Sequence, residues 1–184
     1  MISFLQRVFL CAVIFMSGMS ASGQRLALKT NTLDWLIQSP NLTMEARLNR
    51  RLTIDLGIAC NPIKKTVYSS GLSLRNFRIR PELRYWFNRP MARHFAGIAI
   101  EAGSFDLKFH PHHYTGSGVA AGVTYGYALV LSRHWNVEFS VGAGLARIWG
   151  FDYREPDNRP DNKNMNKWIP VPIGTGVTFS YIFK

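Results

Sequence analysis

The stretch FRIRPELRYWF (residues 77–87) decides the fold, because its side chains alternate strictly between two kinds. In an extended strand, successive side chains point to opposite faces. One face carries Phe77, Ile79, Pro81, Leu83, Tyr85 and Phe87, and the other carries Arg78, Arg80, Glu82, Arg84 and Trp86. A soluble sheet turns its charged face to water, whereas a membrane barrel turns its apolar face to lipid and its charged face to the lumen.

The first 23 residues have the pattern of a secretory signal sequence. Arg7 supplies a basic start, residues 8–16 (VFLCAVIFM) are apolar, and residues 17–23 are rich in small side chains. The apolar run is too short for a transmembrane helix, and no longer run follows it. We therefore expect residues 24–184 to form one exported domain, either a soluble protein or a β-barrel. Cys60 is the only cysteine in this domain, which excludes an internal disulfide.

Period-two alternation recurs along the domain and predicts eight strands, with no helix. Short connections follow the second, fourth and sixth strands, and longer ones, among them residues 110–117 and 150–166, separate the others. An even strand number with short turns at one end and longer loops at the other is typical of outer-membrane barrels. The predicted fold is therefore all-β, an eight-stranded antiparallel up-and-down transmembrane β-barrel, with a soluble barrel as the alternative. Pro81 lacks a backbone donor and is expected to disturb strand pairing locally.

Ten charged residues fall on the parity that would face the lumen. They are Lys29, Glu45, Arg47, Asp55, Arg78, Arg80, Glu82, Arg84, Glu101 and Glu138. Charges in a narrow interior are tolerated only when they are paired and hydrogen-bonded. Because five are basic and five acidic, we expect a balanced network that closes the barrel. An open conducting pore would need a larger strand number.

Two further sets of residues are expected at the ends of the barrel. Aromatic side chains near strand ends should lie at the membrane interfaces: Tyr85, Trp86, Phe87, Trp135, Trp149, Trp168, Tyr181 and Phe183. Arginines in the short turns and near the start of the domain should form a periplasmic basic collar: Arg25, Arg50, Arg51, Arg89, Arg93 and Arg133. We expect this collar either to contact lipid phosphates or an acidic periplasmic partner, or to act only as a membrane anchor.

Five segments resemble a known family: LALKTN (26–31), PELRYWF (81–87), YGY (125–127), LSRHWNVE (131–138) and YIFK (181–184). They are similar to small outer-membrane β-barrel proteins of uncharacterised function, a domain of unknown function found in Gram-negative gut and oral anaerobes. The resemblance implies an outer-membrane barrel, sometimes encoded near fimbrial or surface-adhesin components, and no known catalytic residues. The chain departs from the family pattern near Asp34 and Cys60, where aromatic or apolar residues are more usual.

One cluster has catalytic potential, namely His110, His112, His113, Tyr114 and Ser117. A histidine beside a serine can act as base and nucleophile if a third group orients the base, and Asp106 and Glu101 are the candidates for that group. Closely spaced histidines also bind metals, but only with further ligands. The sequence otherwise contains no phosphate-binding, metal-binding or nucleic-acid motif. We therefore expect no enzyme activity, no metal, no cofactor, no nucleic-acid partner and no small-molecule substrate.

The function predicted from the sequence is that of a small, non-enzymatic outer-membrane barrel that supports the envelope or surface structures such as fimbriae. Its expected partners are outer-membrane lipid and envelope or fimbrial proteins, with residues 150–166 as a contact surface. Two alternatives stay open. One is a lipid-A-modifying outer-membrane enzyme that uses the histidine-rich segment 110–117, and the other is a soluble periplasmic binding barrel.

Overall fold

The computed structural model describes residues 25–61, 73–109, 112–154 and 160–183. The predicted signal sequence (1–23) lies outside these ranges. The described elements are β1 (Leu26–Asn31), α2 (Thr32–Leu36), β2 (Asn41–Arg47), β3 (Leu52–Asn61), β4 (Ser73–Trp86), β5 (Arg93–Phe109), β6 (His112–Val130), β7 (Trp135–Arg154), β8 (Met165–Pro172) and β9 (Gly176–Phe183). No helix in the described ranges is long and apolar enough to cross a membrane.

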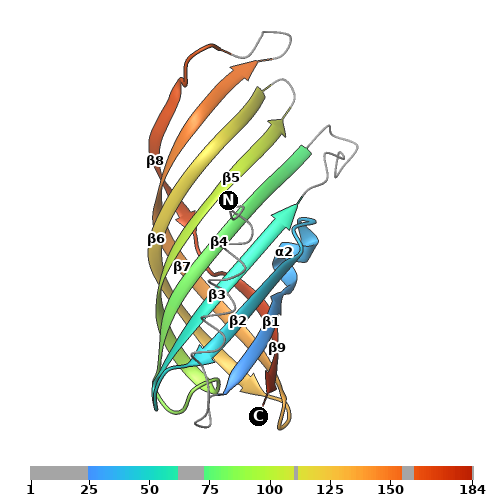
Figure 1. Cartoon of the computed structure of the whole chain (residues 1–184), viewed down its shortest axis with the longest axis vertical. Coiled ribbons are helices and arrows are strands. Elements are labelled where there is room, and N and C mark those ends of the chain that lie inside the picture. Colours follow the sequence, from blue (N-terminus) through green and yellow to red (C-terminus); the bar gives the residue numbers. More distant parts are fainter. Residues whose placement is uncertain (1–24, 62–72, 110–111, 155–159, 184) are drawn as a thin grey trace, which may run out of the picture.

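The strands form a closed antiparallel barrel (Figure 1). Strands β1 to β7 pair with their neighbours in chain order. Both β8 and β9 pair with β7, and β9 returns to β1 in a register that runs from Leu26↔Phe183 to Asn31↔Thr178. Strands β8 and β9 are thus two parts of one eighth strand, which confirms the predicted eight-stranded up-and-down barrel.

A one-residue bulge divides this eighth strand. Between Pro172 and Gly176 the chain advances four residues, while the facing segment of β7 advances three. Gly174 has a φ of 60°, a left-handed conformation that glycine adopts without strain. A shift of one residue exchanges the two faces of a strand. Ile173 therefore points into the lumen and is 1% exposed, although uninterrupted alternation would place it on the lipid face with Val177.

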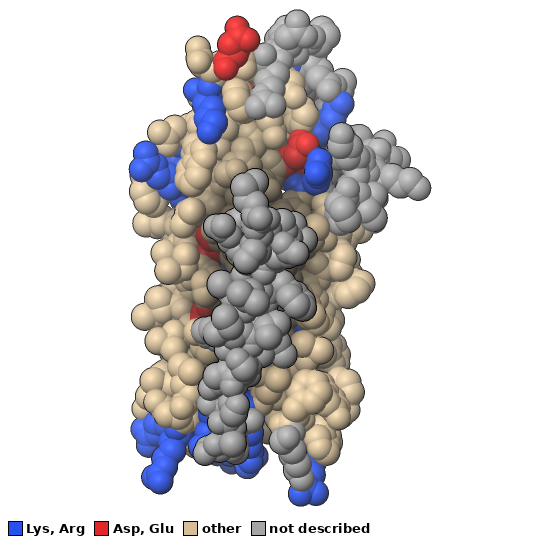
Figure 2. Space-filling view, in the orientation of Figure 1, with Lys and Arg blue, Asp and Glu red and all other residues tan. Residues whose placement is uncertain are grey.

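The outer face of the barrel is apolar and its interior is polar. Ile98, Val123 and Val141 on the outside are 66%, 64% and 64% exposed, whereas Glu45 and Asp55 on the inside are fully buried. The middle of the visible surface carries almost no charge, in contrast to both ends (Figure 2). This distribution is that of a transmembrane barrel, and it excludes a soluble barrel packed around an apolar core.

Pro81 produces the local irregularity that its missing donor predicts. The β4–β5 register pairs Ile79 with Ala102 and Glu82 with Ala99, and no pairing joins the positions between them. On its other side, β4 pairs with β3 without interruption. The irregularity therefore affects one neighbour only and leaves the alternation of the strand intact.

The segment 110–117, expected to be a loop, belongs mostly to strands. Strand β5 runs to Phe109 and β6 starts at His112, so the connection is limited to residues 110–111, which lie outside the described ranges. Similarly, β7 continues to Arg154, which shortens the loop expected over residues 150–166. Both strand ends are polar because they extend past the apolar band, where the outer face meets water.

Helix α2 is a second difference from the sequence prediction. It begins where Asn31 caps the chain, with Asn31 Oδ1 accepting a hydrogen bond of 3.0 Å from the backbone N–H of Leu33. At five residues, the helix is too short to show a 3.6-residue periodicity. The Thr32 hydroxyl donates to the carbonyl oxygen of Val177 at 2.9 Å, which fixes α2 against β9.

The two ends of the barrel differ in construction. Residues 48–51, 87–92 and 131–134 form short connections at what we call the turn end. At the opposite end, the loop end, β4 to β8 continue beyond α2 as a taller wall (Figure 1). Within the described residues, β8 pairs only with β7 and leaves its other edge free.

Two prolines protect the free edge of β8. The backbone N–H of Ile173 donates to the carbonyl oxygen of Gly142 on β7 at 3.1 Å. Because alternate residues of a strand direct their backbone groups to opposite sides, Pro170 and Pro172 occupy the positions whose N–H would face the free edge. Proline has no N–H to offer there, so the edge is a poor template for a further strand.

Candidate functional site: a closed lumen and a basic turn end

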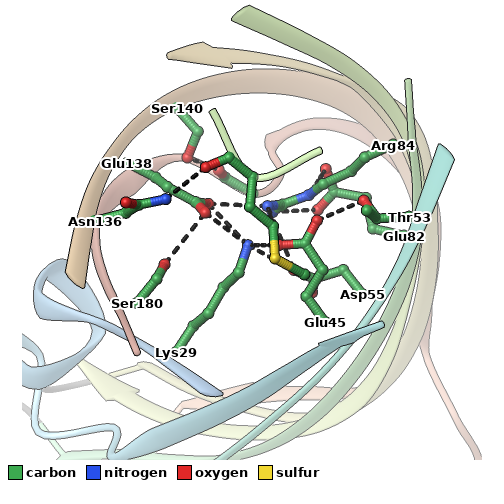
Figure 3. A network of polar contacts seen from close by, with 12 residues as sticks. Lys29, Glu45, Thr53, Asp55, Glu82, Arg84, Asn136, Glu138, Ser140 and Ser180 are labelled. Atoms are coloured by element: carbon green, nitrogen blue, oxygen red, sulfur yellow. Dashed lines mark hydrogen bonds and ion pairs between the residues drawn. The ribbon is translucent and has the colours of Figure 1, made fainter. Parts of the chain in front are cut away.

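Lys29 on β1 lies at the centre of the lumen with 2% of its surface exposed. Its Nζ contacts a carboxylate oxygen of Glu45, lies 2.8 Å from Glu138 Oε1 and lies 3.4 Å from Asp55 Oδ2. Glu45, Glu138 and Asp55 come from β2, β7 and β3, and their side chains converge on Lys29 in the lumen (Figure 3). One lysine thus connects strands from different parts of the barrel wall across the lumen.

Arg84 on β4 joins the same carboxylates from the other side of the lumen. Its Nε lies 2.9 Å from Glu82 Oε1, and its Nη1 lies 2.9 Å from Glu138 Oε2 and 3.4 Å from Asp55 Oδ2. The guanidinium carbon lies 4.6 Å from the ring centroid of Phe95, a cation–π contact. Arg84 and Lys29 share Glu138, so the two halves of the network are continuous.

Uncharged side chains complete the network (Figure 3). The Thr124 hydroxyl on β6 donates to Glu82 at 2.6 Å, and the Ser180 hydroxyl on β9 donates to Glu138 at 3.2 Å. The Thr53 hydroxyl on β3 donates to Glu45. Every strand of the closed ring except β5 therefore supplies a polar group, while β5 supplies the Phe95 ring.

The charges of this innermost cluster do not balance. It contains four carboxylates, from Glu45, Asp55, Glu82 and Glu138, but only two basic groups, from Lys29 and Arg84. Three of these acids face one another directly, because Glu45 pairs with Asp55 across β2–β3 and Asp55 pairs with Glu82 across β3–β4. Directly opposed like charges are destabilising, so the two buried cations are essential to the cluster.

The remaining predicted lumenal charges lie outside this innermost cluster or at its edge. The Nε of Arg47 donates to the carbonyl oxygen of Asn49 in the turn, 3.0 Å away. Arg78 pairs with Asp34 on α2 at 2.6 Å and lies 3.8 Å from Glu101. Arg80 lies 3.9 Å from Glu82 at the edge of the cluster. Asp34 was not predicted to face the lumen because its helix was not predicted.

The β4–β5 connection closes the lumen at the turn end. Met91 has a φ of 62° and is 2% exposed, and Ala92 is equally buried. The backbone carbonyl of Met91 accepts a hydrogen bond of 2.5 Å from Asn136 Nδ2, inside the barrel wall. Sequence reasoning missed this plug, although a methionine in an otherwise polar turn (NRPMAR, 88–93) is an available signal.

Trp86 is not an interfacial aromatic. It is fully buried in the lumen, its Nε1 donates to Thr53 Oγ1 at 2.8 Å, and its ring centroid lies 4.8 Å from that of Phe95. The parity of Trp86 is that of Arg84 and Glu82, which is the signal for its inward orientation. A Cβ atom at Gly126 would lie 2.5 Å from the Phe95 ring, so this packing requires glycine on β6.

The other seven predicted interfacial aromatics lie on outward positions at two levels. Tyr85, Phe87, Trp135, Tyr181 and Phe183 are near the turn end, and Trp149 and Trp168 are toward the loop end. Trp135 and Phe183 both pack edge-to-face on Tyr181, with centroid distances of 5.1 and 5.0 Å. Two aromatic levels flanking an apolar band are what a membrane-spanning barrel presents to its interfaces.

All six arginines of the predicted basic collar lie exposed at the turn end. Basic side chains gather at this end of the visible surface, and acidic ones appear only nearer the middle and the other end (Figure 2). The three short connections, residues 48–51, 87–92 and 131–134, contain no acidic residue. The turn end therefore carries a positive potential that attracts anions.

The histidine-rich segment forms a clamp on the outside of the tall wall. His113 Nε2 lies 2.5 Å from Asp106 Oδ1 on β5, and His113 Nδ1 lies 2.5 Å from the Tyr153 hydroxyl on β7. Both ring nitrogens are thus occupied, which leaves neither available as a base for Ser117. His110 lies outside the described residues, and within the described ranges no group of residues is arranged to hold a metal ion.

Comparisons with known proteins add a family but no activity. The family described as "Protein of unknown function (DUF3575)" matches residues 8–183. No functionally curated protein matches the chain. Among solved structures, the crystal structure of Neisserial surface protein A (NspA) is similar, with 13% sequence identity, coverage of 89% of this chain and 99% of that chain, and a TM-score of 0.48.

Proposed function

The chain belongs to the DUF3575 family of proteins of unknown function, and on that premise we propose a non-enzymatic role in the outer membrane. In this proposal the protein is a closed, non-conducting barrel that supports the envelope or a surface structure. The observation that carries it is the filled lumen, in which Lys29 and Arg84 connect acidic side chains of β2, β3, β4 and β7. A ring bound together across its own interior is a rigid element of the membrane.

The proposed orientation has the turn end in the periplasm. Short connections face the periplasm in outer-membrane barrels, and longer ones face outward. The apolar band of the outer face and the two levels of aromatic side chains support insertion across a bilayer. The arginines of the turn end would then lie beside the phosphate groups of the inner leaflet, which makes outer-membrane lipid the first proposed partner.

The loop end is the proposed contact surface for envelope or fimbrial proteins. There the tall wall of β4 to β8 projects beyond the apolar band and exposes polar strand ends, among them the Asp106–His113–Tyr153 clamp. The clamp fixes β5, β6 and β7 to one another outside the membrane. A rigid projecting sheet is suited to present a surface to a protein partner, and the prolines on β8 limit association through its backbone.

Membrane fractionation tests the location, and bilayer conductance tests the closed lumen. We expect the protein in the outer-membrane fraction, with a gel mobility that changes on heating as the barrel unfolds. In a planar bilayer, the purified protein should give no current steps above those of the lipid alone. Recovery in the soluble fraction, or steady conductance steps, would contradict the proposal.

The non-enzymatic role has its own test in the chemistry of lipid A. Mass spectra of lipid A from cells with and without the gene should be identical, because both nitrogens of His113 are occupied by Asp106 and Tyr153. A changed acyl or phosphate pattern in the deletion strain, restored by the wild-type gene, would instead establish a lipid-A-modifying enzyme.

A further inference from the structure

A pocket of about 420 Å³ opens at the turn end beside the Met91 plug. Three of its lining residues are Arg25 before β1, Arg89 in the β4–β5 connection and Arg133 in the β6–β7 connection. All three are exposed, and no carboxylate within the described ranges forms an ion pair with any of them. Three segments far apart in the sequence thus each contribute an arginine to the lining of one pocket.

A buried residue in the wall of the same pocket has an acceptor without a partner among the described residues. Asn136 lines it and is 1% exposed. Its Nδ2 donates to the Met91 carbonyl, but its Oδ1 has no hydrogen-bond partner within the described ranges. Leaving a buried amide oxygen unsatisfied is costly, so this atom favours a ligand or solvent molecule that carries a hydrogen-bond donor.

These observations define the chemistry of a ligand. Guanidinium groups bind phosphate oxygens in a bidentate manner, and several of them together match the charge of a phosphate. An N–H or O–H group on the ligand would in addition pair with the Asn136 Oδ1. We propose that this pocket binds a phosphate ester that carries an amine or hydroxyl group, such as phosphoethanolamine or glycerol phosphate.

Such an ester has two sources, a phospholipid headgroup of the inner leaflet or a soluble periplasmic compound. The lipid source rests on the proposed function, because it requires the turn end to lie at the periplasmic face of a membrane. Binding of the free ester requires only the folded barrel. Binding of lipid therefore tests the pocket and the proposed function together, whereas binding of the free ester tests the pocket alone.

Calorimetry on the purified full-length protein in a non-ionic detergent tests the site with free phosphoethanolamine. The double variant R89Q/R133Q should bind it about tenfold more weakly or worse, because two charge-assisted contacts are lost. The matched control is R50Q/R51Q, which removes two arginines of the same end that do not line the pocket. The control should bind within about twofold of wild type, since only general attraction is reduced. Heat-dependent gel mobility verifies that both variants are folded.

Sulfate distinguishes a specific phosphate-ester site from general attraction of anions. It carries two negative charges but no donor hydrogen at neutral pH, so it should bind clearly more weakly than phosphoethanolamine. Equal binding of sulfate, or equal weakening in both double variants, would overturn the proposal and leave a non-specific basic surface. Absence of binding of both the free ester and lipid would also overturn it.

Native mass spectrometry on protein extracted from membranes identifies the source. A phospholipid retained by wild type and by R50Q/R51Q, but lost from R89Q/R133Q, supports the headgroup. Binding of the free ester without a retained lipid supports the soluble compound. If neither ligand binds while the protein still fractionates with the outer membrane, the pocket proposal fails and the proposed function stands.

Discussion

Charged side chains fill the turn half of the lumen, whereas in the loop half an apolar cluster lies beside Arg78 and Glu101. In the turn half, Lys29 and Arg84 lie among four buried carboxylates. In the loop half, Ile173 packs with Ala99, Ala120 and Ala146, and Ile148, Ile169 and Val171 lie against this cluster. All of these residues face inward, so an inward position on a strand does not determine whether its side chain is charged or apolar.

The difference follows from the completeness of the wall. In the turn half, the ring is closed through β1 and β9, so a buried charge finds partners in several directions. In the loop half, β8 pairs only with β7 among the described strands, and β1 and β2 have ended. A charge on that wall has fewer partners within reach, and the two charges that lie beside the apolar cluster, Arg78 and Glu101, lie 3.8 Å from each other. Alanine, isoleucine and valine side chains there pack against one another on a single wall.

Removing a cation from the turn half should have the largest effect. In K29M, the buried carboxylates of Glu45, Asp55 and Glu138 would keep only Arg84 as a cation among the described residues, and breaking a buried ion pair costs about 3–5 kcal/mol. We expect a loss of that size in the free energy of unfolding, measured by urea titration in detergent micelles. The control is R47M, whose guanidinium donates to a turn carbonyl and forms no ion pair within the described residues, with an expected change within about 0.5 kcal/mol. Equal losses in both variants would show that the network does not stabilise the barrel.

A smaller effect should come from the apolar wall. I173A and I98A remove the same atoms, but Ile173 is 1% exposed in the lumen and Ile98 is 66% exposed on the lipid face. Lipid chains refill the space at Ile98, whereas a cavity stays at Ile173. I173A should therefore cost more by on the order of 1–2 kcal/mol, the contribution of the cavity. The same urea titration measures the difference, and equal costs would mean that the loop half has no packed interior.

Period-two alternation was enough to assign faces wherever the strands are regular. The alternation in the sequence assigns Lys29, Glu82 and Glu138 to the inward face, and in the structure all three lie buried in the lumen. The reason is physical, since an ionised side chain on the lipid face costs several kcal/mol, on the order of 2–4 at the bilayer midplane. The strand number follows from the same pattern.

The partners of each charge were not available from the pattern. Alternation gives the face of a residue but not its height in the barrel, which depends on the stagger between strands. Arg47 and Arg84 both fall on the inward face of their strands, yet only Arg84 reaches Glu138. The bulge at Gly174 was equally hidden, because one extra residue between glycines leaves no break in the composition. Uninterrupted alternation would therefore give the wrong face for Ile173.

The smallest effect should come from the polar clamp outside the tall wall. Y153F removes the hydroxyl that bonds His113 Nδ1 at 2.5 Å, and a single hydrogen bond contributes about 0.5–1.5 kcal/mol. Its loss should be local, because β5, β6 and β7 stay paired below the clamp. We expect faster amide hydrogen exchange at the loop ends of these strands, with the turn half unchanged. Y114F is the matched control, since the Tyr114 ring stacks on His112 and its hydroxyl forms no hydrogen bond within the described residues. Faster exchange throughout the barrel in Y153F would contradict the independence of the two halves, because it would couple a contact outside the membrane to the charged lumen.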